Sequence, residues 1–223
     1  AAETQPAPPA EPASAPEAAT DAGAAPAAPP TAAEASPALV DEHGPRPYQE
    51  PDLGHIASSE AFLLPRHSAA VAQAIAVLVQ VEAPVAFDRL ARRVAAAFGI
   101  ERVTERVRDR IRDLLPPGRI DADAVVWAAT DQPGRLVGFR VPGDGDTGQR
   151  RAEELPLLEV GNAMRWLLRQ HGALSRDDLA REAARQFGIA RLGSVVRAVM
   201  AEALQRLAAD GEVLVTDELV RLA

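Results

Sequence analysis

The sequence predicts a mainly helical protein with small β wings, arranged as a tandem winged-helix repeat behind a disordered Ala/Pro-rich tail. Two observations lead to this prediction. First, residues 71–111 align without a gap on residues 160–200, and 14 of the 41 aligned positions are identical. Second, each copy reads as three amphipathic helices separated by turns and followed by short β-like runs. A self-similar stretch of this length indicates two copies of one small module.

The first 66 residues precede the repeat. Residues 1–40 are rich in Ala, Pro, Glu and Thr, and such a segment cannot bury enough apolar surface to offset its ordering entropy. We therefore expect residues 1–40 to be a disordered tether. Residues 41–66 carry Tyr48, Ile56 and Phe62 among several prolines. They predict an extended strap that lays some of these side chains on the first module; a loose linker is the alternative.

Residues 67–141 form the first predicted module. Its helices are expected at about 67–81, 87–98 and 103–115. The first should end at Ala83 because the residue before a proline is pushed out of the helical region. Gly99 follows the second helix, where a left-handed cap is favourable, and a Pro-Pro-Gly sequence stops the third. The runs 123–128 and 135–141, with the sequence DQPG between them, predict a hairpin that would be the wing.

Residues 142–156 are polar and Gly-rich and predict a linker to the second module, residues 157–223. The second module should have helices at about 158–171, 175–187 and 192–209, followed by a short hairpin in residues 212–223. Ser175 and Asp178 resemble a capping box at the start of its second helix. The identical pairs Leu90/Leu179 and Phe98/Phe187 occupy inward helix positions, so packing alone explains their repetition.

The net charge of −8 is concentrated in the first part of the chain. Residues 1–66 contain ten acidic residues and two arginines, whereas residues 67–223 contain 22 acidic residues and 22 arginines. The chain has no lysine, so all 24 basic residues are arginine. Because the repeat is neutral as a whole, only local arginine patches could attract phosphate.

Several classes of function are not indicated. No apolar run approaches the length of about 18–20 residues that a membrane helix needs, and no signal peptide is visible, so a cytoplasmic protein is expected. The absence of cysteine removes disulfides and thiolate metal sites. No phosphate-binding loop, dinucleotide fingerprint or nucleophile motif is present. We therefore predict no catalytic residues, no metal, no cofactor and no small-molecule ligand for this chain.

Arginines on the third helices are the candidate nucleic-acid contacts, because the second helix of a helix-turn-helix motif enters the major groove. A solvated, salt-bridged face is the alternative for the first module, since Glu105, Asp109 and Asp113 lie among its arginines. The acids favour backbone contact over base reading. Arg102 and Arg191 are a repeated pair that fits either a phosphate contact or an ion pair holding the turn. The candidate contacts are Arg102, Arg106, Arg108, Arg110, Arg112, Arg135, Arg191 and Arg197.

Two strings carry a family resemblance: VEAPVAFDRLARRVAAAFGIERV (residues 81–103) and ALSRDDLAREAARQFGIARLG (residues 173–193). Over about residues 45–223 the chain resembles the uncharacterised C-terminal domain of large bacterial helicase-like proteins. Those proteins pair a superfamily-one ATPase with, often, a nuclease domain of the mismatch-endonuclease type. The family's second Gly and its His are Ala83 and Ala86 here. The matching positions are Glu82, Pro84, Val85, Leu90, Arg92, Arg93, Gly99 and Arg102.

The resemblance implies that helicase and nuclease chemistry would reside upstream of these residues. We therefore expect a non-catalytic accessory module that contacts nucleic acid non-specifically through arginine. Its expected partners are DNA and an upstream ATPase domain of the same or a partner chain. A protein-docking module within the same assembly is the main alternative, and a winged-helix transcription regulator is a further one.

Overall fold

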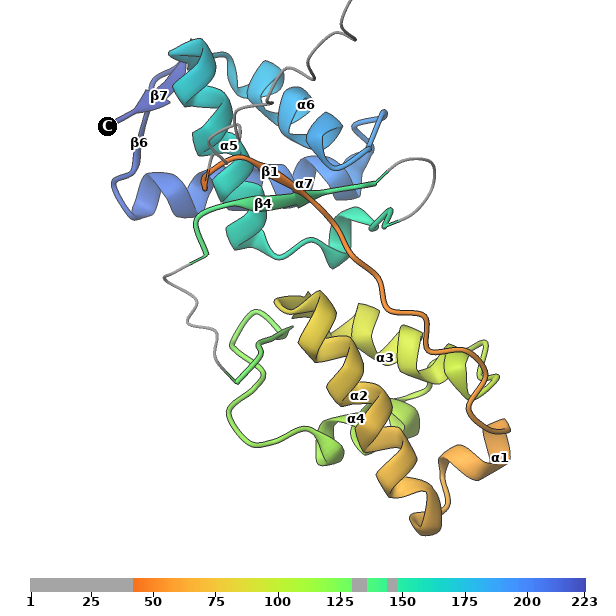
Figure 1. The fold of residues 1–223 in the computed structure, drawn as a ribbon. Coiled ribbons are helices and arrows are strands. Elements are labelled where there is room, and N and C mark those ends of the chain that lie inside the picture. Colours follow the sequence, from red (N-terminus) through yellow and green to blue (C-terminus); the bar gives the residue numbers. More distant parts are fainter. Residues whose placement is uncertain (1–41, 130–135, 144–147) are drawn as a thin grey trace, which may run out of the picture. The chain divides into compact units, whose positions relative to one another are not determined.

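The fold is mainly helical with small β-sheets, as the sequence predicts (Figure 1). The structure is a computed structural model that describes residues 42–129, 136–143 and 148–223. The predicted disorder of residues 1–40 and the candidate contact Arg135 lie outside the described residues. None of the described helices is both long and apolar enough to cross a membrane.

Three helices make up the first repeat: α2 (Ser68–Glu82), α3 (Phe87–Ala97) and α4 (Glu105–Leu114). Their ends lie within two residues of the predicted ones. Ala83 has an extended conformation with ψ 144° before Pro84, so α2 ends where the proline requires. Gly99 has φ +67° after α3, the left-handed conformation expected of a cap. Both predicted stop signals are confirmed.

The core of the first repeat lies among α2, α3 and α4. Leu78, Leu90 and Phe98 are fully buried in it. Short helix α1 (Ser59–Phe62) and the 3-10 helix η1 (Pro65–His67) precede α2. Phe62 from α1 is fully buried, and its ring packs edge-on against Phe98 with 5.3 Å between the ring centroids. The segment before the repeat therefore supplies part of the first core.

The hairpin predicted from residues 123–128 and 135–141 is wrong. Strand β3 (Val125–Val126) pairs antiparallel with β2 (Val85–Ala86), and Val126 also bridges Ile120. The physical reason is a tighter turn nearer in sequence, in which Asp121 Oδ1 accepts hydrogen bonds from the amides of Asp123 and Val125, both at 2.9 Å. The first repeat therefore contains a short hairpin over residues 119–127.

The second predicted strand of that hairpin has a different partner. Strand β4 (Phe139–Val141) pairs in parallel with β1 (Pro45–Pro47), which comes from the segment before the repeat. Phe139 is buried in the hydrophobic core of the second repeat, where it contacts Phe187 edge-on at 5.9 Å between centroids. Residues 139–141 therefore pack with the second repeat, although the sequence assigned them to the first.

The second repeat follows the same plan. It contains η3 (Ala152–Glu154), α5 (Leu157–His171), α6 (Arg176–Gln186) and α7 (Ser194–Ala209). The hydroxyl of Ser175 accepts a hydrogen bond from the amide of Asp178 at 3.1 Å, which confirms the predicted cap of α6. Leu179 and Phe187 are buried like their equivalents Leu90 and Phe98, so the predicted inward positions are confirmed.

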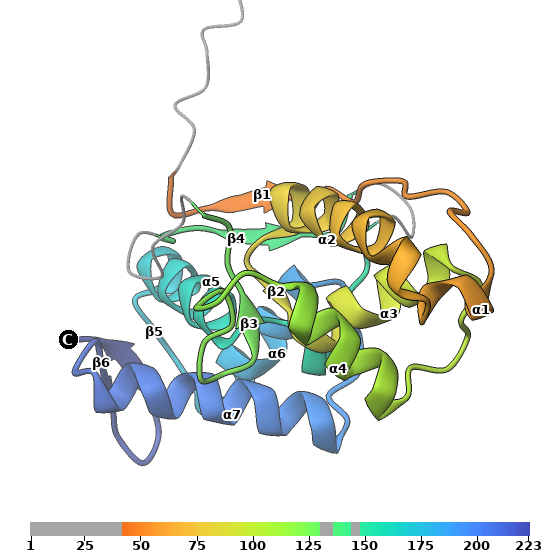
Figure 2. The ribbon, with the colours of Figure 1, turned by 90° about the horizontal axis from the view of Figure 1, so that it is seen from below.

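A three-stranded sheet closes the second repeat at the C-terminal end of the described chain (Figure 2). Strands β5 (Ala173–Leu174), β6 (Val213–Val215) and β7 (Val220–Leu222) pair in the order β5-β7-β6. The predicted hairpin in residues 212–223 is confirmed by the antiparallel pairing of β6 and β7. In both repeats, the strand after the first helix pairs with the last strand of the hairpin.

Candidate nucleic-acid interface

The surface of α4 carries a row of acidic residues with arginines on both sides of it, because residues four apart lie on one side of a helix. The outermost row is acidic and every member of it is exposed. It consists of Glu105, Asp109 and Asp113, and the exposed Glu101 lies in the turn before the helix. A row of carboxylates at the centre of the outward side repels phosphate, so α4 is poorly suited to lie in a major groove.

Two predicted contacts on α4 are paired with acids of the protein. Arg108 forms an ion pair with Asp88 of α3. Arg112 pairs with Asp109 at 2.9 Å, and its guanidinium carbon lies 4.9 Å from the centroid of the Phe87 ring. Both pairs are partly exposed. Pairs of this kind contribute little to stability, but they neutralise the charge that a phosphate would meet.

Arg110 holds the segment before α2 in place. Its Nη2 donates to the Leu64 carbonyl at 2.9 Å and to the Ser68 hydroxyl at 3.1 Å. Its guanidinium carbon also lies 5.9 Å from the centroid of the Phe62 ring. A half-buried arginine with these partners serves the fold, and the sequence offered no signal to separate it from its exposed neighbours.

Arg102 and Arg106 are different, because both are exposed and neither forms an ion pair with any described residue. Arg102 lies in the turn before α4 and Arg106 in the first turn of the helix. These two side chains flank the acidic row. They are the part of the predicted α4 site that remains free to contact a phosphate backbone.

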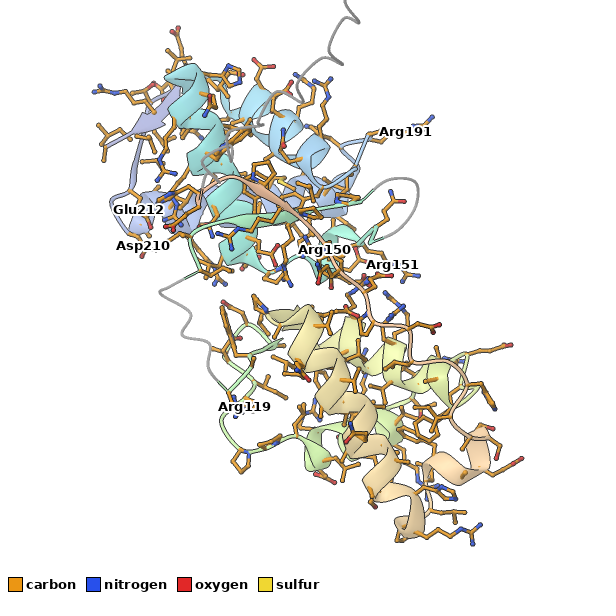
Figure 3. All side chains as sticks on the ribbon, in the orientation of Figure 1. Arg119, Arg150, Arg151, Arg191, Asp210 and Glu212 are labelled. Atoms are coloured by element: carbon orange, nitrogen blue, oxygen red, sulfur yellow. The ribbon has the colours of Figure 1, made fainter. Side chains whose placement is uncertain are left out.

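The second repeat presents Arg191 and Arg197, which are also exposed and make no ion pair within the described ranges. Arg191 lies in the turn before α7 and points away from the protein (Figure 3). Arg197 is the equivalent of Arg108, yet its Nε donates to the Leu192 carbonyl at 3.1 Å instead of meeting a carboxylate. Both therefore keep an uncompensated positive charge near the start of α7.

Two further described arginines, Arg140 and Arg119, lie in or near the predicted first wing. Arg140, which the sequence placed in the first wing, donates from Nη1 to the carbonyl of Glu82 at 2.6 Å and from Nη2 to that of Pro84 at 2.5 Å. It also pairs with Glu159 of α5. Arg119 has no ion pair among the described residues, and it lines an apolar groove between α2 and the residues that follow α4.

A buried network of charged residues, here termed the junction cluster, was not predicted. It draws on the segment before the repeat, on both repeats and on the predicted linker. Every member is almost fully buried except Arg140, whose side chain is 15% exposed. The members are Tyr48, Glu82, Arg89, Arg140, Arg150, Glu154 and Glu159.

Tyr48 lies at the centre of the junction cluster. Its hydroxyl donates to Glu82 Oε2 at 2.6 Å and accepts from Arg89 Nε at 3.1 Å. Arg89 also donates to the same Glu82 oxygen at 2.9 Å and lies 3.4 Å from Glu154. The guanidinium carbon of Arg150 lies 4.2 Å from the centroid of the Tyr48 ring. Burial and the Glu82 carboxylate raise the pKa of the Tyr48 phenol, so it remains a hydrogen-bond donor.

Glu159 joins the two other arginines of the junction cluster. Arg150 donates to both Glu159 carboxylate oxygens at 3.1 Å, and Arg140 donates through Nε and its backbone amide at 3.1 Å. The Glu159 side chain is fully buried. Charged residues this deeply buried are rare unless they are paired. One signal was available in the sequence: Glu82 is the single charged residue of the otherwise apolar α2.

The junction cluster predicts a loss of stability in acid. Burial alone would raise the pKa of Glu159, but the charges of Arg150 and Arg140 hold it below its ordinary value. The pKa of Glu154 is likewise lowered, with burial outweighed by Arg92, the Arg151 amide and Arg89. A carboxylate whose folded pKa is depressed stabilises the protein above the unfolded pKa of about 4.3 and loses that contribution as pH falls through the folded pKa.

We therefore expect the free energy of unfolding to change little between about pH 6 and 8 and to decrease below about pH 4. Urea denaturation at several pH values measures it. The difference in free energy of unfolding between the unmodified chain and Glu159→Gln should shrink as the pH falls, because protonation of Glu159 removes the charge that the variant lacks. A difference that stays constant down to pH 3 would show that ionised Glu159 contributes nothing.

Comparison with known families gives one match. Residues 60–109 match a family described as "Protein of unknown function (DUF3320)". The matched residues run from α1 through α3 into the middle of α4, and so include Glu82, Arg89, Arg102 and Arg106. A comparison with curated proteins found no match. This part of the chain is therefore similar to an uncharacterised domain.

Proposed function

We propose that the two repeats are winged-helix modules that contact nucleic acid non-specifically through arginine side chains. They would serve as a non-catalytic accessory part of a larger bacterial protein of the helicase or nuclease type. Two findings support the fold assignment. Each repeat has the element order helix, strand, helix, helix, hairpin. In each, the first strand pairs with the last strand of the hairpin.

The observation that carries the proposed contact is the equivalence of Arg102 and Arg191. They stand at the same position of the repeat, in the turn before the third helix, and both are exposed without an ion pair among the described residues. Arg106 and Arg197 lie within the first turns of the same helices. Phosphate contacts by arginine position a protein on nucleic acid without reading sequence. The acidic row of α4 fits this backbone mode better than base reading.

A charge-reversal experiment tests the proposal. The chain with Arg102, Arg106, Arg191 and Arg197 all changed to Glu should bind duplex DNA at least about tenfold more weakly than the unmodified chain at low salt. Fluorescence anisotropy with labelled duplexes of unrelated sequence measures the affinity, and the duplexes should bind about equally well. Single-stranded DNA in the same assay shows which form is preferred.

The matched control reverses four exposed arginines that already have partners and lie off the third helices: Arg46, Arg66, Arg181 and Arg185. This variant changes the net charge by the same amount. It should retain most of the affinity for DNA if binding depends on where the arginines lie and not on the net charge. An equal loss in both variants would mean that binding reflects net charge alone. No detectable binding of the unmodified chain at about 50 mM salt would refute the proposed contact.

Protein docking remains the second candidate function, and the acidic row of α4 is the observation that favours it. Three exposed carboxylates at helical spacing suit a basic protein surface better than a phosphate backbone. Under this alternative the unmodified chain would not bind DNA. It would form a stable complex with an upstream ATPase domain supplied as a separate chain.

A further inference from the structure

An apolar groove on the first repeat is open at the position that the second repeat fills with its own helix. The groove has a volume of about 550 Å³ and lies between α2 and the residues that follow α4. Its walls include Ala72, Ala76 and Val79 of α2 together with Leu115 and Pro116. Among the described residues that line it, Arg119 is the only charged one.

The difference between the repeats comes from the length of the third helix. Helix α4 ends at Leu114, where Pro116 and Pro117 follow, whereas α7 continues to Ala209. In its last turns, α7 places Leu207 over Gly161 of α5: a Cβ on Gly161 would lie 3.4 Å from Leu207 Cδ2. Leu207 is only 5% exposed. Ala72 is the equivalent of Gly161, and it lines the open groove of the first repeat.

The sequence of α2 independently indicates that this groove is normally covered. From Ala69 to Val81 the helix has no charged residue and only Gln73 and Gln80 as polar ones. A helix with no charged residue on any side is typical of a buried environment. Yet Ala76 is exposed, and Val81 is 38% exposed. The corresponding positions of α5 differ, because Arg165 replaces Ala76 and pairs with Glu212.

We propose that this groove binds an amphipathic helix of a protein partner. The helix presents a leucine to the floor formed by Ala72 and Ala76, as Leu207 does on α5, and a carboxylate to Arg119. Charge complementarity supports the acidic group, because Arg119 is half-buried at the groove and has no ion pair among the described residues. Docking of an amphipathic helix into an apolar groove is a common mode of peptide recognition. This inference goes beyond the nucleic-acid contact and does not depend on it.

The chain supplies its own probe for the test. A fluorescent peptide with the sequence of residues 194–211 contains Leu207 and, three residues later, Asp210. We expect it to bind the full chain in fluorescence anisotropy. The Ala72→Arg variant should bind it at least about tenfold more weakly, since the added side chain fills the floor of the groove and repels Arg119. Ala72 is only half-buried, so this variant should fold, which circular dichroism verifies.

Two controls make the test specific. Gln73→Arg adds the same charge to the exposed side of α2 outside the groove lining and should leave peptide binding unchanged. A peptide with Leu207→Ala should bind at least about fivefold more weakly. No binding at peptide concentrations up to about 1 mM, or equal binding by the two arginine variants, would overturn the proposal. Dimerisation of the chain that Ala72→Arg abolishes would also overturn it, because a second copy would then be the occupant.

Discussion

Replacing Glu159 with glutamine is expected to destabilise the protein by about 3–5 kcal/mol, because removing one member of a buried ion pair leaves the other charge uncompensated. Here two guanidinium groups, those of Arg140 and Arg150, lose their shared carboxylate. Glutamine keeps the shape of the side chain, so packing changes little. Urea denaturation at pH 7 measures the loss.

A triple variant separates the charge effect from the packing effect. Glu159→Met combined with Arg140→Met and Arg150→Met removes all three charges while retaining apolar volume. Replacing a whole buried ion cluster in this way is often close to neutral, so the triple variant should be more stable than Glu159→Gln. Glu153→Gln, on an exposed neighbour, should change stability by less than about 0.5 kcal/mol. Equal losses in Glu159→Gln and Glu153→Gln would contradict the role of the junction cluster.

Leu90→Ala and Leu179→Ala should each destabilise the protein by about 2–5 kcal/mol, since each removes a fully buried side chain from a closely packed core. The two leucines are equivalent positions of the repeat, and each lies in the core of its own repeat. Leu214→Ala is the matched control, because Leu214 is 46% exposed. Leu214→Ala should lower the free energy of unfolding by much less than either core variant.

Tryptophan fluorescence follows the two cores separately, because Trp127 belongs to the first repeat and Trp166 packs in the core of the second. With Trp166 or Trp127 replaced by phenylalanine, the remaining tryptophan reports one half. The junction cluster contains residues of both repeats, so we expect the two urea transitions to coincide. If Leu90→Ala shifts only the Trp127 transition, the junction cluster does not couple the two cores.

The helices and their inward positions could be predicted because the information for them is local. Leucine and phenylalanine at helical spacing, the Ala83-Pro84 bond and Gly99 together define α2 and α3 without reference to distant residues. The repeat doubled this information, since an identical residue in both copies at an inward position indicates packing. The same local signals identified the hairpin β6–β7, whose strands are close in sequence.

The first wing and the junction cluster could not be predicted because they depend on contacts between distant residues. The run around Phe139 reads as a strand, but its partner β1 lies more than ninety positions earlier, so the sequence offered a nearer and incorrect partner. Arg150 and Glu154 lie in a polar, Gly-rich stretch that resembles a solvated linker. Arg150 is buried against the Tyr48 ring and Glu159, and Glu154 is buried beside Arg89.

The candidate site could be predicted only in part, because some of its arginines contact residues that are distant in the sequence. Helical spacing places Arg106, Arg108 and Arg110 on α4, and all but Arg110 reach the surface in the way the spacing indicates. Spacing could not reveal that Asp88 on α3 would neutralise Arg108 or that the Leu64 carbonyl would hold Arg110. The free pairs Arg102/Arg106 and Arg191/Arg197 emerge only when these tertiary partners are known.

The salt dependence of DNA binding tests the central claim most directly. Each neutralised phosphate releases counterions, and the slope of log K against log salt is about −0.9 per contact for duplex DNA. Four free arginines therefore predict a slope of roughly −3 to −4 for the unmodified chain, and a much smaller slope when Arg102, Arg106, Arg191 and Arg197 are all changed to Glu. An affinity that does not change with salt, or a slope that the four changes leave intact, would contradict nucleic-acid contact through these arginines.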